Sequence, residues 1–217
     1  MANAVQSISN RENSIRAYRF QGPKWIPVSA GLPPMLFEQY DPDAVEDLLL
    51  THPVLYPGYK KGDIDPKNIQ HPPHQLRDKP YRDAWGCLWE TDLDGMIGAV
   101  TEHALEDWDN FENFKAPDPD VTDGMLPIDW KEVARWAKEA REKDELLAYF
   151  LPHGHTFLRL QDLRGYTNLM YDMFDEEPRL FELIAMLEDF NLRVIERYLT
   201  FKPDMIGISV RNIDDQN

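Results

Sequence analysis

The sequence contains a single cysteine, Cys87, among 217 residues. Because a disulfide needs two cysteines, no internal disulfide can form, and a cysteine-based metal site would need ligands of other types. The sequence also lacks any run of about 18 apolar residues, the length that crosses a bilayer as a helix. Its first residues include no apolar stretch typical of a secretory signal. These absences predict a cytoplasmic protein that does not enter the membrane.

Positive charge is scarce as well. The chain has 23 lysines and arginines against 39 aspartates and glutamates, which gives a formal net charge of −16 at pH 7. Nucleic acids and anionic membranes attract clustered positive charge, so we expect neither as a partner. Hydrophobic residues make up 42% of the chain and charged residues 29%, which is typical of a globular protein. The length suits one large domain or two small ones.

Apolar periodicity and helix start signals predict several helices. Proline after an acidic N-cap marks two of the starts, and the last predicted helix carries a continuous apolar stripe. Residues 1–20 read as a short polar helix or an arm. The other predicted helices are a segment that begins at Asp41-Pro42, residues 130–143 after the N-cap Asp129, a segment that begins at Thr156, and the segment from Glu177-Pro178 to about residue 201.

Four short segments are predicted to be strands: residues 25–30, 54–59, 146–151 and 205–210. Residues 83–103 read as a β-hairpin, because Asp94-Gly95 is a favoured turn dipeptide and the flanking residues partly alternate in polarity. The order of strands and helices implies parallel βα units, hence an α/β protein.

Residues 146–174 hold the first group of candidate site residues. A buried strand there runs into a Pro-His-Gly-His turn and then into a helix, and α/β folds place ligands in such loops. His153 and His155, two residues apart in the turn, are candidates for a catalytic role in proton transfer. The alternative is a pair of loop histidines that bond to the backbone where the helix starts.

Arg159 and Arg164 follow in the first turns of the same helix. They are candidates for binding an anionic substrate, because the helix N-terminus adds to the attraction. The alternative is structural pairing with Asp162, Asp172 or Asp175 in a chain that is rich in carboxylates.

Trp85, Trp89 and Glu90 lie on the first arm of the predicted hairpin. Trp85 and Glu90 are candidates for substrate binding, as parts of a lid over a pocket. The alternative is that the tryptophans form the packed face of the hairpin.

These residues carry a resemblance to the uroporphyrinogen decarboxylase superfamily. Residues 153–165, HGHTFLRLQDLRG, are similar to its GxPxTLxxYxxEG-type loop. The resemblance extends over most of residues 10–208. It is carried further by NLMYDM (168–173), EPRLFEL (177–183), DMIG (204–207), and, for the insert of the methyltransferase-like branch, WGCLWE (85–90), DGMIG (94–98) and EHALEDW (102–108).

The resemblance implies a (β/α)₈ barrel. The chain corresponds to its N-terminal half, through about the fourth strand, with a hairpin insert at about 81–103 and without the C-terminal half. We therefore expect residues 1–217 to form a single partial barrel domain from a truncated reading frame. A half barrel leaves strand edges unpaired, through which copies of the chain can associate.

The same resemblance implies a parent enzyme of corrinoid- and zinc-dependent methyltransferase type, acting on a small molecule with a corrinoid protein as partner. Its HxC…C-type zinc ligands would lie in the missing half. We therefore expect no metal site or other cofactor in this chain, and a catalytically incomplete product.

Two alternatives stay open. The first is uroporphyrinogen decarboxylase itself, whose arginine-rich loop would match residues 28–40. Val28 and Leu32 stand at the arginine places there, and the arginines would be needed for the carboxylates of a tetrapyrrole. The second is a non-enzymatic half-barrel remnant.

Overall fold

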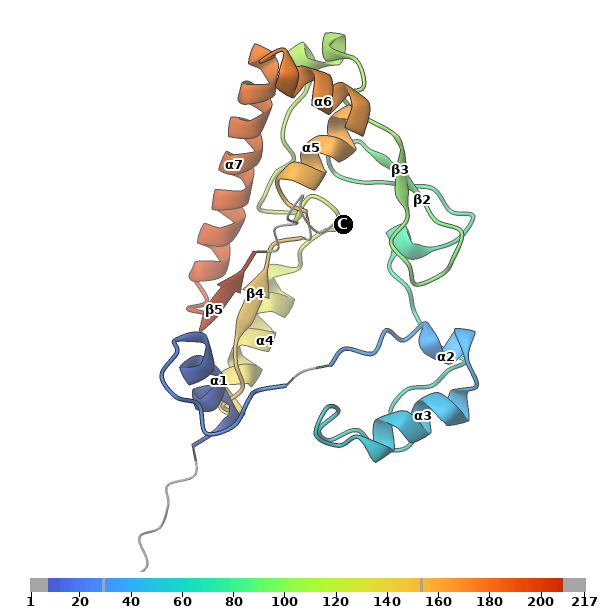
Figure 1. The fold of residues 1–217 in the computed structure, drawn as a ribbon, viewed down its shortest axis with the longest axis vertical. Helices are drawn as coiled ribbons and strands as arrows, with labels where there is room; N and C mark the ends of the chain where they lie inside the picture. Colours follow the sequence, from blue (N-terminus) through green and yellow to red (C-terminus); the bar gives the residue numbers. More distant parts are fainter. Residues whose placement is uncertain (1–7, 29, 153, 209–217) are drawn as a thin grey trace, which may run out of the picture. The chain divides into compact units, whose positions relative to one another are not determined.

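The described residues form a mixture of helices and two small β-sheets (Figure 1). The computed structural model describes residues 8–28, 30–152 and 154–208. They divide into two compact units. The first contains the residues up to Pro80 together with Glu90–Ala99, and the second contains Tyr81–Trp89 and the residues from Val100 onward.

The first unit is helical and has a small core. Its elements are α1 (Asn10–Tyr18), α2 (Leu36–Gln39), α3 (Pro42–Thr51) and the 3₁₀ helix η1 (Pro73–Gln75). The core consists of Phe37, Val45 and Leu49, with tyrosine and isoleucine side chains packed around them. Asp41 caps α3 by accepting a hydrogen bond from the amide of Asp43, as the Asp-Pro pair predicts.

Two strands predicted for this unit are wrong. Residues 25–28 and 30 lie in no strand, and neither do residues 54–59, of which 54–58 form turns and a bend. Ile26 is 82% exposed and Val54 74% exposed, so neither segment has a sheet against which to bury its apolar side chains. In the first segment, the buried Asn13 of α1 donates a hydrogen bond to the carbonyl of Trp25. Prolines interrupt the second, and a proline cannot donate to a sheet.

The predicted hairpin is confirmed as part of a three-stranded sheet. Its strands are β1 (Tyr81–Arg82), β2 (Leu88–Glu90) and β3 (Ala99–Glu102), in the order β1-β2-β3. β1 pairs with β2 antiparallel, with Tyr81 opposite Trp89. Asp94 and Gly95 form a turn, in which Gly95 has a φ of 84°.

The second sheet is a parallel pair. β4 (Ala148–Phe150) lies beside β5 (Met205–Gly207), with Ala148 opposite Met205. Three consecutive helices connect the two strands: α5 (Phe157–Arg164), α6 (Tyr166–Phe174) and α7 (Pro178–Leu199). α4 (Trp130–Glu142) precedes β4, and the 3₁₀ helix η2 (Trp108–Asn113) precedes α4. This is the βαβ arrangement expected from the sequence.

Side chains from α4 and α7 cover one face of this pair. Tyr149 of β4 is buried with Val133 and Ala137 of α4, and its ring stacks on that of Tyr198 with centroids 4.5 Å apart. A larger cluster joins α5, α6 and α7 to Trp89 of β2 and to Trp85 and Cys87 in the turn between β1 and β2.

The α/β class is therefore confirmed, and the described residues form no closed barrel. The C-terminal residues of the predicted strand 205–210 lie outside the described residues. Within the described part of the chain, no helix has both the length and the apolar character needed to cross a bilayer.

Candidate functional site

The carboxyl end of β4 brings three of the predicted site residues together. Trp85, His155 and Arg159 line one small cavity, whose other walls come from Asp123, Pro152, Phe190 and Asn191. The cavity has a volume of about 10 Å³, room for roughly one water molecule. A larger ligand therefore requires that side chains at the rim move.

Arg159 lies in this cavity as a paired, buried cation. Its Nη1 is 2.6 Å from Oδ2 of Asp83 and 3.8 Å from Oδ2 of Asp162. Asp83 is itself held in place, because it accepts hydrogen bonds from the indole N–H of Trp89 and the amide of Cys87. Two carboxylates thus face one guanidinium, and little of its charge is left for an anionic substrate.

Burial changes the chemistry of two neighbours. It raises the pKa of Asp162 to about 6, against the opposing attraction of Arg159. Burial also raises the pKa of Cys87 to about 12, and the Asp83 carboxylate adds to the effect. The Cys87 thiol is therefore protonated at neutral pH, and its Sγ lies 3.2 Å from the carbonyl oxygen of Asp162. A protonated, buried thiol is neither a nucleophile nor a good metal ligand.

Two features constrain the backbone of the turn after β4: a hydrogen bond from α7 and a glycine with a positive φ. The carbonyl of His155 accepts a hydrogen bond of 3.0 Å from the side-chain amide of Asn191 on α7. Gly154 has a φ of +74°, and a Cβ there would lie 2.5 Å from Cβ of Leu158. The position therefore requires glycine. His153, the other predicted catalytic histidine, lies outside the described residues.

Arg164, at the far end of α5, belongs to a different cavity. Its Nε donates to Oδ2 of Asp172 at 2.7 Å, and its Nη1 donates to the carbonyls of Leu105 and Glu106. Its guanidinium lies 4.0 Å from the ring centroid of Trp108. These contacts match the structural alternative that the sequence left open.

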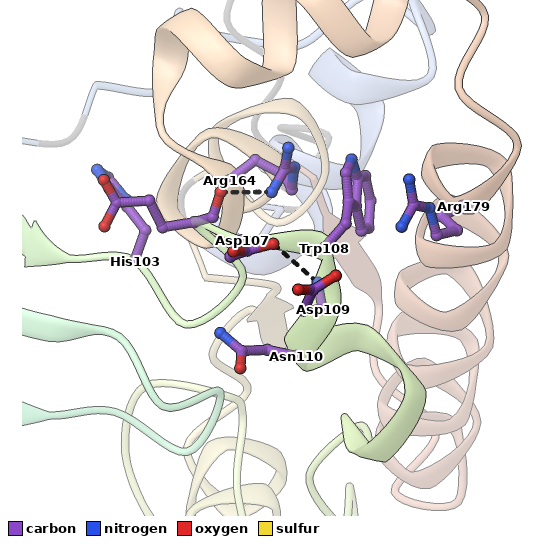
Figure 2. Close-up of a pocket in the computed structure, with 8 residues that line it drawn as sticks. His103, Asp107, Trp108, Asp109, Asn110, Arg164 and Arg179 are labelled. Carbon is purple, nitrogen blue, oxygen red and sulfur yellow. Dashed lines mark hydrogen bonds between the residues drawn. The ribbon is translucent and has the colours of Figure 1, made fainter.

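This second cavity has a volume of about 670 Å³. In Figure 2, the Trp108 ring stands between Arg164 and Arg179. Arg179 is paired with Glu177, whose pKa is lowered to about 2 by hydrogen bonds from Arg179. The other charged lining residues are Glu106, Asp107 and Asp109, so the charge of the lining disfavours anionic ligands.

Glu90, at the end of β2, lines a third cavity of about 420 Å³ with Arg77, Lys79 and Asp92 among its neighbours. All of these residues belong to the first unit. The structure thus groups Trp85 with His155 and Arg159, whereas Arg164 and Glu90 line other cavities.

Sequence reasoning missed Asp83, Asp123 and Asn191. One signal could have indicated Asp83: it lies two residues before the candidate Trp85. A buried arginine such as Arg159 needs a carboxylate to compensate its charge. With 39 acidic residues in the chain, however, the pattern does not say which one fills that place.

Among the described residues, no three histidine, cysteine, aspartate or glutamate side chains converge as a metal site would require. Comparison with known protein families, with curated proteins and with solved structures gives no match. The resemblance drawn from the sequence therefore stays a prediction.

Proposed function

We propose that the chain belongs to the methyltransferase-like branch of the uroporphyrinogen decarboxylase superfamily, and that β4 and β5 are neighbouring strands of its (β/α)₈ barrel. The observation that carries the proposal is the loop at the carboxyl end of β4. It follows a strand of a parallel pair, and it groups His155 and Arg159 with Trp85. Barrel enzymes place their substrates at this end of their strands.

The proposed roles follow from the environment of each residue. Pro152 and His155, each half-buried as a whole residue, form the rim that a small-molecule substrate would contact. Both ring nitrogens of His155 are buried, so substrate contact with them requires that the ring turn outward. An imidazole can donate or accept a proton, so His155 is the residue we assign to proton transfer. Arg159, balanced by Asp83 and Asp162, positions the first turn of α5, and Trp85 supplies an apolar wall.

The zinc ion of this branch does not fit the described residues. Cys87 is fully buried and its thiol stays protonated, and no group of three ligands is present in the described part of the chain. Activation of a thiol by zinc would therefore need ligands from outside these residues. The corrinoid would be presented by a partner protein at the rim.

Uroporphyrinogen decarboxylation is less well supported. Its substrate carries eight carboxylates, which need several free cations in one site. Arg159 and Arg164 are buried, engaged by Asp83 and Asp172, and line separate cavities. The net charge of −16 further opposes such a ligand.

Calorimetric titration of the full chain with cobalamin and with uroporphyrin distinguishes the methyltransferase-like function from uroporphyrinogen decarboxylation. We expect cobalamin to bind with an affinity in the micromolar range, and uroporphyrin not to bind. His155→Ala should weaken cobalamin binding about tenfold, which is the loss of one polar contact. The matched control is His52→Ala, at an exposed histidine beyond the end of α3. Uroporphyrin binding would support the decarboxylase instead, and binding of neither ligand would support a non-enzymatic remnant.

A further inference from the structure

The longest helix, α7, has a second apolar face. Its first face is buried in the core through Leu183, Leu187 and Val194, among others. In Figure 1, α7 lies along one edge of the second unit. On its outer side Phe181 is 59% exposed, Leu192 51% and Leu199 52%. These are large apolar surfaces for a helix whose core-facing side is already packed.

The residues of the outer face follow the spacing of a helix–helix seam. Intervals of four and three residues alternate along it, as they do at the a and d positions of a coiled coil. The outer seam consists of Phe181, Ala185, Glu188, Leu192, Ile195 and Leu199. Ile195 lies at the edge of this seam, because part of its side chain packs against the core. Glu188 is its single polar member. A polar residue at one seam position lowers affinity and restricts the register of pairing.

The charges beside the outer seam are arranged with opposite signs at its two ends. Glu182, Glu188 and Asp189 lie in the N-terminal part, and Arg193 and Arg197 lie in the C-terminal part, with Glu196 between them. Within the described chain, neither Asp189 nor Arg193 takes part in an ion pair. A second α7 in antiparallel orientation would bring Asp189 next to Arg193 of the other copy, twice by symmetry.

We propose that the outer seam of α7 binds the outer seam of a second copy of this chain, as an antiparallel helix pair. Antiparallel pairing also places each helix dipole against the opposite end of the other, whereas parallel pairing would place acidic halves together. The pair is isologous, so it closes as a dimer. One helix pair is a small interface, and a dissociation constant in the micromolar range is expected.

Sedimentation of the full chain over a range of concentrations tests the dimer. We expect the mass to rise from 25.4 kDa toward twice that value as concentration increases. Leu192→Glu places two charges in the centre of the pair and should weaken dimerisation by about 100-fold or more. The control is Phe174→Glu, at an aromatic residue that is 85% exposed and lies off the seam. Glu188→Leu should strengthen the dimer.

A charge exchange tests the orientation. Arg193→Glu and Asp189→Arg should each weaken self-association about tenfold, because each turns two symmetric attractions into repulsions. An equimolar mixture of the two variants should form a heterodimer, since the new charges then complement each other. Far-ultraviolet circular dichroism of every variant shows that the helices are intact.

Three results would overturn the proposal. The first is a wild-type chain that stays monomeric up to roughly 100 μM, far above the expected dissociation constant. The second is a dimer that Leu192→Glu leaves unchanged, which would place the contact elsewhere. The third is a mixture of the charge variants that associates no better than each variant alone, which would exclude the antiparallel arrangement.

Discussion

Asp83 determines whether Arg159 can be buried at all. Its carboxylate, fully shielded from solvent, lies 2.6 Å from the guanidinium, while Asp162 is more distant at 3.8 Å. Removing one partner of a buried ion pair leaves the other charge uncompensated, which costs about 3–5 kcal/mol. We expect Asp83→Asn to lower the free energy of unfolding by this amount in urea denaturation. The control, Asp120→Asn at an exposed aspartate, should change it by less than about 0.5 kcal/mol. Equal effects would mean that the pair contributes nothing.

Asp162 makes the stability of the fold depend on pH. Its folded-state pKa of about 6 lies above the usual 3.8, so the folded protein binds this proton more tightly than the unfolded chain does. The contribution to stability is complete below pH 3.8 and is lost as the pH rises through 6. Asp162→Asn removes this dependence, because asparagine does not titrate.

The stability of Asp162→Asn relative to wild type should therefore improve by about 2 kcal/mol between about pH 4 and about pH 7. Urea denaturation at several pH values measures the difference. The exposed Asp175→Asn serves as the control measured over the same pH range. A flat difference for Asp162→Asn would show that its carboxyl is solvated in the folded protein.

At the scale of single elements, two N-caps that look alike in the sequence differ in the structure. Asp129 accepts hydrogen bonds from the amides of Lys131 and Glu132 at the start of α4. Thr156, at the start of α5, makes no side-chain hydrogen bond to its helix. We expect Asp129→Ala to cost about 1 kcal/mol in the free energy of unfolding, and Thr156→Ala to cost much less. If urea denaturation gave equal losses of unfolding free energy for the two variants, the side chain of Asp129 would not be the more effective cap.

The helices were predictable because their signals are local. The pairs Asp41-Pro42 and Glu177-Pro178 mark starts within one residue of where α3 and α7 begin. A helix satisfies its own backbone, so periodicity and caps identify it without knowledge of the rest of the fold. Strands depend on partners. Residues 148–150 form a strand because they pair with β5. Residues 25–28 lie in no strand, although the residue types of Trp25 and Ile26 favour one.

The candidate site was predictable only in its location. The loop after residues 146–151 followed from the order of strand and helix, and His155 and Arg159 do line a cavity there. What the sequence could not provide is the choice of partner: it offered Asp162, Asp172 and Asp175 as alternatives and did not indicate Asp83. The partners of Arg159 and Arg164 lie 76 and 8 residues away, at Asp83 and Asp172, and only the packed chain selects them from among many carboxylates.

At the scale of the whole molecule, the two units have cores of different size. Among the described residues, the first unit buries Phe37, Val45 and Leu49 in one small cluster. The second buries a cluster of thirteen residues that runs from Trp85 to Val194. Because hydrophobic burial is the main favourable term in folding, the smaller core should open at lower free energy.

Hydrogen exchange measured by mass spectrometry at increasing urea tests this difference. We expect the amides of α3 to lose protection at a lower urea concentration than those of α7. Leu49→Ala, at a residue 3% exposed in the first core, should reduce protection in α3 and leave α7 unchanged. Leu183→Ala removes a fully buried side chain from the second core and should cost about 2–5 kcal/mol there, with α3 unaffected. If both helices lost protection together in every variant, the two units would form one cooperative domain, because local opening separates only regions that unfold independently.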